Sequence, residues 1–145
     1  MYRFNLESLL NHRCYQEEVL QRELADLKKR LAAEKDKLRA LKKKMREYAQ
    51  QLQQKQKEGR CASEIKLFFD FADHISQDIR DQHQKVAGAQ KNFYLKREEL
   101  IAVVKKRKAL DKLKAKGRQA YQQRQLKKER DFMDEVASRQ FHFEP

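Results

Sequence analysis

The sequence is nearly without the two residue types that make turns. Among its 145 residues there are three glycines and one proline, and the proline is the last residue. Sandwiches, barrels and doubly wound sheets need a turn about every 8–12 residues, so these folds are excluded. The absence of tryptophan, an aromatic content of 9% and a charged content of 39% also disfavour a compact enzyme.

Long hydrophobic runs are missing as well. The longest runs, such as Ile101 to Val104, are far shorter than the roughly 18 residues of a membrane span. The first residues also lack the apolar core of a signal peptide. Cys14 and Cys61 are isolated and form neither a CxxC site nor a disulfide framework. We therefore expect a cytosolic protein with two free thiols and no transmembrane segment.

The charge is strongly basic and unevenly spread. A formal charge of +13 favours nucleic acid, anionic lipid or an acidic protein surface as the partner. Residues 28–46 hold ten Lys and Arg and residues 91–130 hold fifteen, whereas residues 61–83 hold two bases and five acids. Runs such as Lys42 to Lys44 wrap around a helix and form no single stripe, which favours a solvated or protein-facing surface. The alternative is a coiled-coil arm that binds nucleic acid.

Apolar residues recur at alternating spacings of three and four in two long series. Eleven of the fourteen positions in each series are apolar, which is the pattern of a heptad coiled-coil seam. The first series is Leu6, Leu10, Arg13, Glu17, Leu20, Leu24, Leu27, Leu31, Glu34, Leu38, Leu41, Met45, Tyr48 and Leu52. The second series is Ile65, Phe68, Ala72, Ile75, Ile79, Gln82, Val86, Ala89, Phe93, Lys96, Leu100, Val103, Arg107 and Leu110. The sequence therefore predicts an all-α fold of two long helices.

The two series are separated by a short stretch that contains Gly59, where the hydrophobic phase is lost. Two helices joined by a short loop form an antiparallel hairpin. We expect a first helix over about 5–56, a turn over about 57–62 and a second helix over about 63–139, within one domain, 1–145. If partner residue numbers sum to 120, thirteen of the fourteen seam positions of each helix face a seam position of the other.

The ends of the helices carry further signals. Asn5 is the expected N-cap of the first helix and Ser63 that of the second. The second helix is the longer of the two and overhangs the first. Apolar residues of the overhang, including Phe132, Met133 and Val136, have no second helix to pack against, so this face requires a partner.

Polar residues in the seam and aromatic residues beside the turn are notable. Glu17 is expected near Arg13 and within reach of Arg107, so that their charges compensate. Phe69 and Phe71 lie off the seam, next to the acidic stretch. They form either an exposed docking surface or a cap over the end of the seam.

No residues with catalytic or metal-binding spacing are present. The four histidines include no i, i+4 pair and have no cysteine at ligand spacing. Phosphate-binding loops and nucleophile elbows are missing, and a two-helix hairpin offers no enclosed pocket. We therefore expect no enzyme activity, no catalytic residue, no metal and no cofactor.

Both ends of the sequence resemble the flagellar export FliJ family, the soluble stalk of the flagellar type III export machine. The opening from Phe4 to Arg13, followed by Glu17 and Glu18, is similar to the start of the family. The end resembles its final helix, with an Asp-Glu-x-Ala-x-Arg pattern at Asp134, Glu135, Ala137 and Arg139. Injectisome stalk proteins share this architecture, so the flagellum and the injectisome both stay open as alternatives.

The resemblance implies a function that spacing alone does not. Family members are antiparallel coiled coils similar to the gamma subunit of rotary ATP synthases. The implied partners are the hexameric flagellar export ATPase, the membrane-embedded export gate and export chaperones, with no direct nucleic acid. The implied location is the cytoplasm, at the periphery of the inner-membrane export apparatus. The implied contacts with the ATPase ring are Arg13, Arg124, Lys128, Arg130 and Arg139, and those with the gate are Leu41, Tyr48, Phe71 and Ile75.

Overall fold

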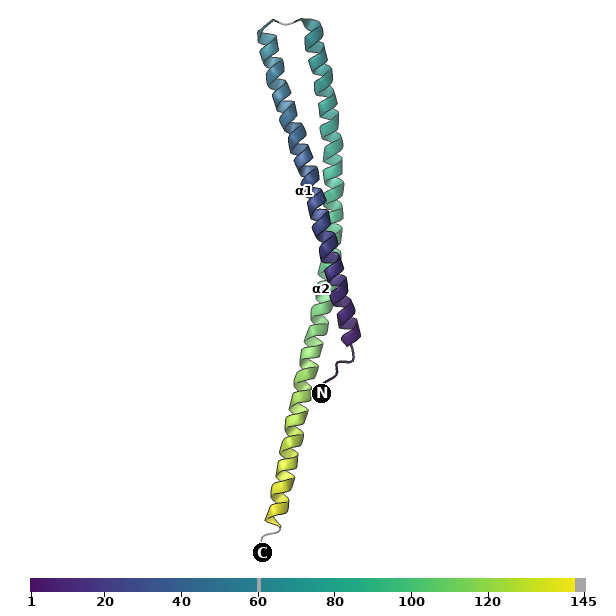
Figure 1. Cartoon of the computed structure of the whole chain (residues 1–145), viewed down its shortest axis with the longest axis vertical. Helices are drawn as coiled ribbons and strands as arrows, with labels where there is room; N and C mark the ends of the chain where they lie inside the picture. Colours follow the sequence, from purple (N-terminus) through teal and green to yellow (C-terminus); the bar gives the residue numbers. More distant parts are fainter. Residues whose placement is uncertain (60, 143–145) are drawn as a thin grey trace. The chain divides into compact units, whose positions relative to one another are not determined.

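Two long α-helices make up nearly all of the chain (Figure 1). The structure, a computed structural model, describes residues 1–59 and 61–142. Helix α1 spans Glu7–Lys57 and helix α2 spans Ala62–Phe141, and the described residues contain no β-strand. The predicted all-α class with two helices is confirmed.

The start of each helix differs slightly from the expected cap. Asn5 lies in a turn, closed by the N–H of Glu7 donating to the carbonyl of Phe4 at 3.1 Å, and α1 begins after it. At the start of α2, the carbonyl of Cys61 accepts from the N–H groups of Glu64 and Ile65 at 3.1 and 3.3 Å. The residue whose carbonyl takes the first helical bond is the N-cap. The prediction that Ser63 caps α2 is therefore wrong, because Cys61 holds that position.

The chain divides into two compact units, each built from both helices. Unit 1 comprises residues 1–18 and 101–145, and unit 2 comprises residues 19–100. In each unit a segment of α1 packs antiparallel to a segment of α2 (Figure 1). Unit 2 contains the loop between the helices, and unit 1 contains the C-terminal part of α2.

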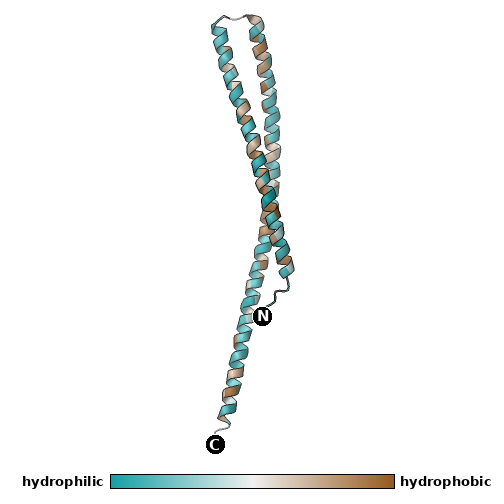
Figure 2. Ribbon diagram, in the orientation of Figure 1, coloured by the Kyte–Doolittle hydropathy of each residue, from teal (hydrophilic) through white to brown (hydrophobic). Residues whose placement is uncertain are grey.

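The predicted seam is the buried surface in both units. Of its 28 positions, 27 are buried or half-buried, and only Leu6, at 41% exposed, is not. The most shielded apolar side chains are Leu10 and Leu110 in unit 1 and Leu31, Leu38 and Ile75 in unit 2. Apolar residues are otherwise dispersed along both ribbons, with a group at the start of α2 (Figure 2). No helix within the described residues is long and apolar enough to cross a membrane.

The pairing register follows the predicted one. Side chains that meet across the two helices have residue numbers that sum to values between 115 and 124, close to the predicted 120. In unit 2 these pairs are Glu23–Lys96, Glu34–Gln82 and Tyr48–Phe71, and in unit 1 they are Glu7–Lys114 and Glu17–Arg107. The position of the loop therefore sets the partners over the length of each unit.

Helix α1 ends at a glycine with a left-handed backbone. Gly59 has φ of +68°, and its N–H donates to the carbonyl of Gln56 at 3.3 Å. Residues with a Cβ are disfavoured in this region of the backbone, so glycine is the preferred residue just after a helix. Gly88 is different, because it lies within α2 and has open space where a Cβ would be.

We expect opposite effects from alanine at these two glycines. Gly59→Ala should lower the free energy of unfolding by about 1 kcal/mol, because alanine disfavours positive φ. Gly88→Ala should raise it by about 1 kcal/mol through its higher helix propensity. Urea unfolding followed by far-UV circular dichroism measures both changes. Equal effects of the two substitutions would contradict the turn at Gly59.

Candidate protein-docking surfaces

A buried glutamine links the two helices in unit 2. Gln82 is 6% exposed, and its amide donates to the backbone carbonyl of Glu34 at 2.9 Å and also to the Glu34 carboxylate. This hydrogen bond, together with the positive charges of Lys37 and Lys85, lowers the pKa of Glu34 below its ordinary value. A buried amide is costly without a partner, so this pair favours a single register.

Two seam cations are paired in the same way. The ammonium of Lys96 lies 2.8 Å from the carboxylate of Glu23, and this contact raises the pKa of Lys96. In unit 1, Arg107 binds the carboxylate of Glu17, as the sequence predicted, and this contact raises the pKa of Arg107. Each acid lies on α1 and each cation on α2, so both pairs connect the helices.

The third member of the predicted charge cluster has a different partner. The guanidinium of Arg13 donates to the side-chain carbonyl of Gln16 at 2.9 Å, with its Nε buried and without a hydrogen-bond partner among the described residues. Glu17 is engaged by Arg107 from the opposite helix. The predicted sharing of Glu17 between two arginines is therefore replaced by separate partners.

The first residues of the chain extend the seam of unit 1 beyond α1. The ring of Tyr2 lies 5.8 Å from that of Tyr121, and a Cβ on Gly117 would lie 2.0 Å from the Tyr2 hydroxyl. The N-terminal amine of Met1 donates to the Tyr121 hydroxyl at 3.1 Å and lowers the pKa of Tyr121. We call residues 1–4 the N-terminal strap. Only glycine at position 117 leaves room for Tyr2, the tyrosine of the strap.

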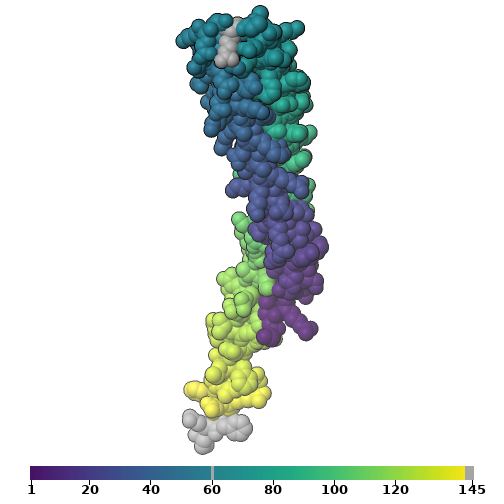
Figure 3. All heavy atoms as spheres, turned by 45° about the horizontal axis from the view of Figure 1, so that its top comes forward, coloured from purple at the N-terminus to yellow at the C-terminus, as the bar shows by residue number. Residues whose placement is uncertain are grey.

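The part of α2 beyond the strap is uncovered. Every residue from Leu126 to His142 is exposed, including Phe132 at 65% and Met133 at 68%. Within unit 1, no other described segment covers this stretch in the face that Figure 3 shows. We call residues 122–142 the tail. Apolar side chains at this degree of exposure on a lone helix are typical of a surface that binds a partner.

A second group of exposed apolar residues lies in unit 2 next to the loop. The rings of Tyr48 and Phe71 stack at 4.6 Å, and Tyr48 also contacts Phe68 at 5.3 Å. The ammonium groups of Lys44 and Lys55 lie over Phe71 and Phe68, 5.4 and 4.0 Å from the ring centroids. We call these five residues the aromatic cluster. Its rings pack across the seam between the two helices near the loop, and its cations lie over two of the ring faces.

The described residues hold no candidate metal centre. Among them, no three His, Cys, Asp or Glu side chains gather where they could hold a metal ion. Cys14 and Cys61 are free thiols. A hydrogen bond with Ser63 lowers the pKa of Cys61, which lies in the open beside the loop.

Comparison with known protein families gives a match over almost the whole chain. A family model described as the flagellar FliJ protein matches residues 2–144. The chain belongs to the FliJ family. As a FliJ protein it is a component of the flagellar export apparatus, in a family of stalk proteins that are not known as enzymes. Comparison with curated proteins and with solved structures gives no match.

The FliJ resemblance predicted five contacts with an ATPase ring, and in the structure these residues lie in two different places. Arg124, Lys128, Arg130 and Arg139 lie on the tail and are exposed. Arg139 pairs with Glu135 at 2.8 Å, one turn earlier. Arg13 instead lies in the paired part of unit 1 and is half-buried. Four of the five predicted contacts therefore lie on the exposed tail, and Arg13 does not.

The four predicted gate contacts of this FliJ protein differ in exposure. Phe71 is 39% exposed, whereas Ile75 is 3% exposed and Leu41 is half-buried. Tyr48 is half-buried under Phe71. The residues beside them that are most available are Leu67 and Phe69, at 68% and 51% exposed. The sequence placed Phe69 off the seam, and the structure shows it on the surface.

The contact of Tyr2 with Gly117 was not foreseen from the sequence. The spacing from Leu110 through Lys114 and Gly117 to Tyr121 continues the alternation of four and three, and this pattern was the available signal. It was not recognisable as a seam, because a lysine and a glycine stand at two of these positions. Their partners come from the strap and from the first turn of α1, where Glu7 lies 2.9 Å from Lys114.

A double-mutant cycle tests the contact between Tyr2 and Gly117. In a Tyr2→Ala background, Gly117→Ala should stabilise the FliJ protein by about 1 kcal/mol through helix propensity. In the presence of Tyr2 this gain should disappear, because the new Cβ displaces the ring. Unfolding free energies of the four proteins give the coupling. Additive effects would show that Tyr2 does not lie against Gly117.

The Glu34–Gln82 contact predicts a specific pH dependence. A carboxyl with a lowered pKa in the folded state contributes stability that is present above about pH 5 and lost as the pH falls through the folded-state pKa. We therefore expect Glu34→Gln to lose less stability than the wild type between about pH 6 and 3. Chemical unfolding at a series of pH values measures this difference. Glu98→Gln, at an exposed position on α2, is the matched control and should follow the wild type.

Proposed function

We propose that this FliJ protein is the stalk of the flagellar export apparatus and that its tail enters the ring of the hexameric export ATPase. The exposed apolar tail is the observation that carries the proposal. A helix with exposed Phe132, Met133 and Val136 and no second helix beside it needs an apolar surface to cover it. The narrow interior of a ring of subunits provides such a surface around a single helix.

The charge of the tail supports a docking role. Arg124, Lys128 and Arg130 are exposed on the tail, and long cationic side chains steer a helix towards an acidic surface. Arg13, which the resemblance assigned to the same contact, is held by Gln16 in the paired part of unit 1. We therefore propose that the tail makes the ring contact and that Arg13 supports the helix pair.

The aromatic cluster is the proposed contact with the membrane-embedded export gate. Phe71 is 39% exposed, and the more exposed Leu67 and Phe69 beside it enlarge the apolar surface. Ile75 and Leu41 lie in the seam and support this surface by holding the two helices together. Export chaperones are further proposed partners, and attachment to both the ATPase and the gate would place the protein at the membrane periphery.

The ATPase activity of the purified export ATPase tests the ring contact. The full chain should stimulate ATP hydrolysis, and the chain ending at Gly117 should not, because it lacks the tail. The triple substitution Arg124→Glu/Lys128→Glu/Arg130→Glu should lose stimulation in the same way. Full stimulation by the truncated chain would overturn the insertion of the tail.

Two matched proteins control this experiment. Lys105→Glu/Lys106→Glu/Lys108→Glu makes the same charge change in unit 1 outside the tail, and it should retain stimulation. Phe71→Ala alters only the aromatic cluster, so it should stimulate the ATPase normally but bind the gate protein less in a pull-down assay.

A further inference from the structure

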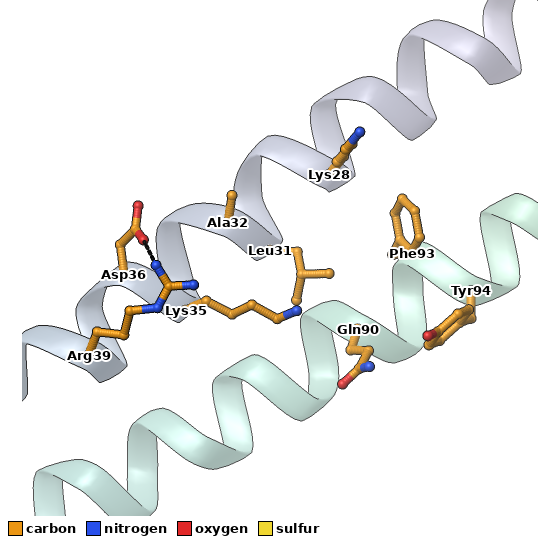
Figure 4. Close-up of a pocket in the computed structure, with 9 residues that line it drawn as sticks. All are labelled: Lys28, Leu31, Ala32, Lys35, Asp36, Arg39, Gln90, Phe93 and Tyr94. Carbon is orange, nitrogen blue, oxygen red and sulfur yellow. Dashed lines mark hydrogen bonds and ion pairs between the residues drawn. The ribbon is translucent and has the colours of Figure 1, made fainter. Parts of the chain in front are cut away.

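A groove with an apolar floor and cationic walls runs between the helices in the middle of unit 2 (Figure 4). Leu31 of α1 and Phe93 of α2 face each other across its floor, and Leu31 is 9% exposed. Lys28, Lys35 and Arg39 line it from α1, and Tyr94 lines it from α2. We call these six residues the basic groove. It contains none of the residues assigned above to the ATPase or the gate.

The cations of the groove are available to a ligand. Asp36 is the one acid that lines the groove among the described residues, and it pairs with Arg39 at 3.4 Å. Lys28 and Lys35 are exposed and make no ion pair or hydrogen bond within the described part of the chain. Unpaired cations beside apolar side chains favour a ligand that carries both negative charge and apolar surface.

The row of cations continues along α1 beyond the groove. Lys28, Lys35, Arg39, Lys42 and Arg46 follow one another at the spacings of a single helix flank, and all five are exposed. From the first to the last they span about five helical turns, roughly 27 Å. A ligand that uses the whole row is therefore long and straight, with negative charges repeated at helical spacing.

The flank of α2 that lies beside this row of cations is also mainly positive. It contributes Arg80 and Arg97 and a single acid, Asp73, all exposed. The opposite side of unit 2 is mixed in charge. Its cations, such as Lys37 and Lys85, stand among acids such as Glu23 and Asp78. The excess of positive charge thus lies on one side of the helix pair, which gives a docking helix a defined side to bind.

We propose that the basic groove binds an acidic amphipathic helix of a partner protein, which packs alongside α1 and α2 as a third helix. An apolar side chain of that helix lies on Leu31 and Phe93, and its carboxylates pair with Lys28 and Lys35. Tyr94, which is 50% exposed and meets Phe93 edge to face at 5.8 Å, forms the wall on the α2 side. A nucleic acid would satisfy the cations but would leave the apolar floor uncovered, so the groove favours a protein helix.

Binding of a designed peptide to the full chain tests this site. The probe is a fluorescent peptide of about 20 residues with Leu at heptad seam positions and Glu on both flanks. The variant Lys28→Glu/Lys35→Glu should raise its Kd about tenfold or more, because two attractions become repulsions. The control Lys29→Glu/Lys43→Glu makes the same charge change on the side of α1 that faces away from the seam, and should change Kd about twofold or less.

A reversed probe excludes unfolding as the cause. A peptide with Lys in place of Glu should bind Lys28→Glu/Lys35→Glu more tightly than it binds the wild type. Equal weakening by the two double variants would show general charge attraction and overturn the proposal, as would failure of the Glu peptide to bind. The proposal would also fail if oligo(dT), and not the peptide, lost affinity selectively on Lys28→Glu/Lys35→Glu.

Discussion

The structure depends on one constraint: in a seam between only two helices, each side chain is shielded from solvent on one side only. No described side chain is fully enclosed, and the most buried, Ile75, is 3% exposed. Burial is instead spread over the 28 seam positions, most of them half-buried. Stability then grows with the number of residues that stay paired, so both helices must run without interruption. The scarcity of glycine and proline follows from this requirement.

Apolar seams of constant period can slip by a heptad, and polar pairs oppose such a slip. Gln82, Lys96 and Arg107 stand at seam positions of α2, and each meets a glutamate of α1. A shift of seven residues would separate all three from these glutamates and leave Gln82 and Arg107 against leucine, where an unpaired amide or cation is costly. The polar positions therefore give specificity to a seam that leucine alone would leave ambiguous.

The seam between two helices fully encloses none of the described side chains, so the candidate functional features lie on the surface of each unit. The tail exposes apolar side chains along a single helix, the aromatic cluster packs across the seam near the loop, and the basic groove lies on one side of unit 2. The three surfaces differ in charge and in shape. This variety is consistent with the separate partners proposed above for this flagellar export component.

The sequence by itself determined the helices, the seam, the register and the family, because heptad spacing and the position of Gly59 are local properties of the chain. It also indicated that Phe69 and Phe71 lie off the seam. The tertiary structure decided which side chains are exposed and which partners they have, because these properties depend on the opposing helix. Phe71 is exposed but Ile75 is not, Arg13 binds Gln16 and not Glu17, and Tyr2 lies against Gly117. These outcomes depend on which side chains meet across the seam, and spacing along one helix does not contain that information.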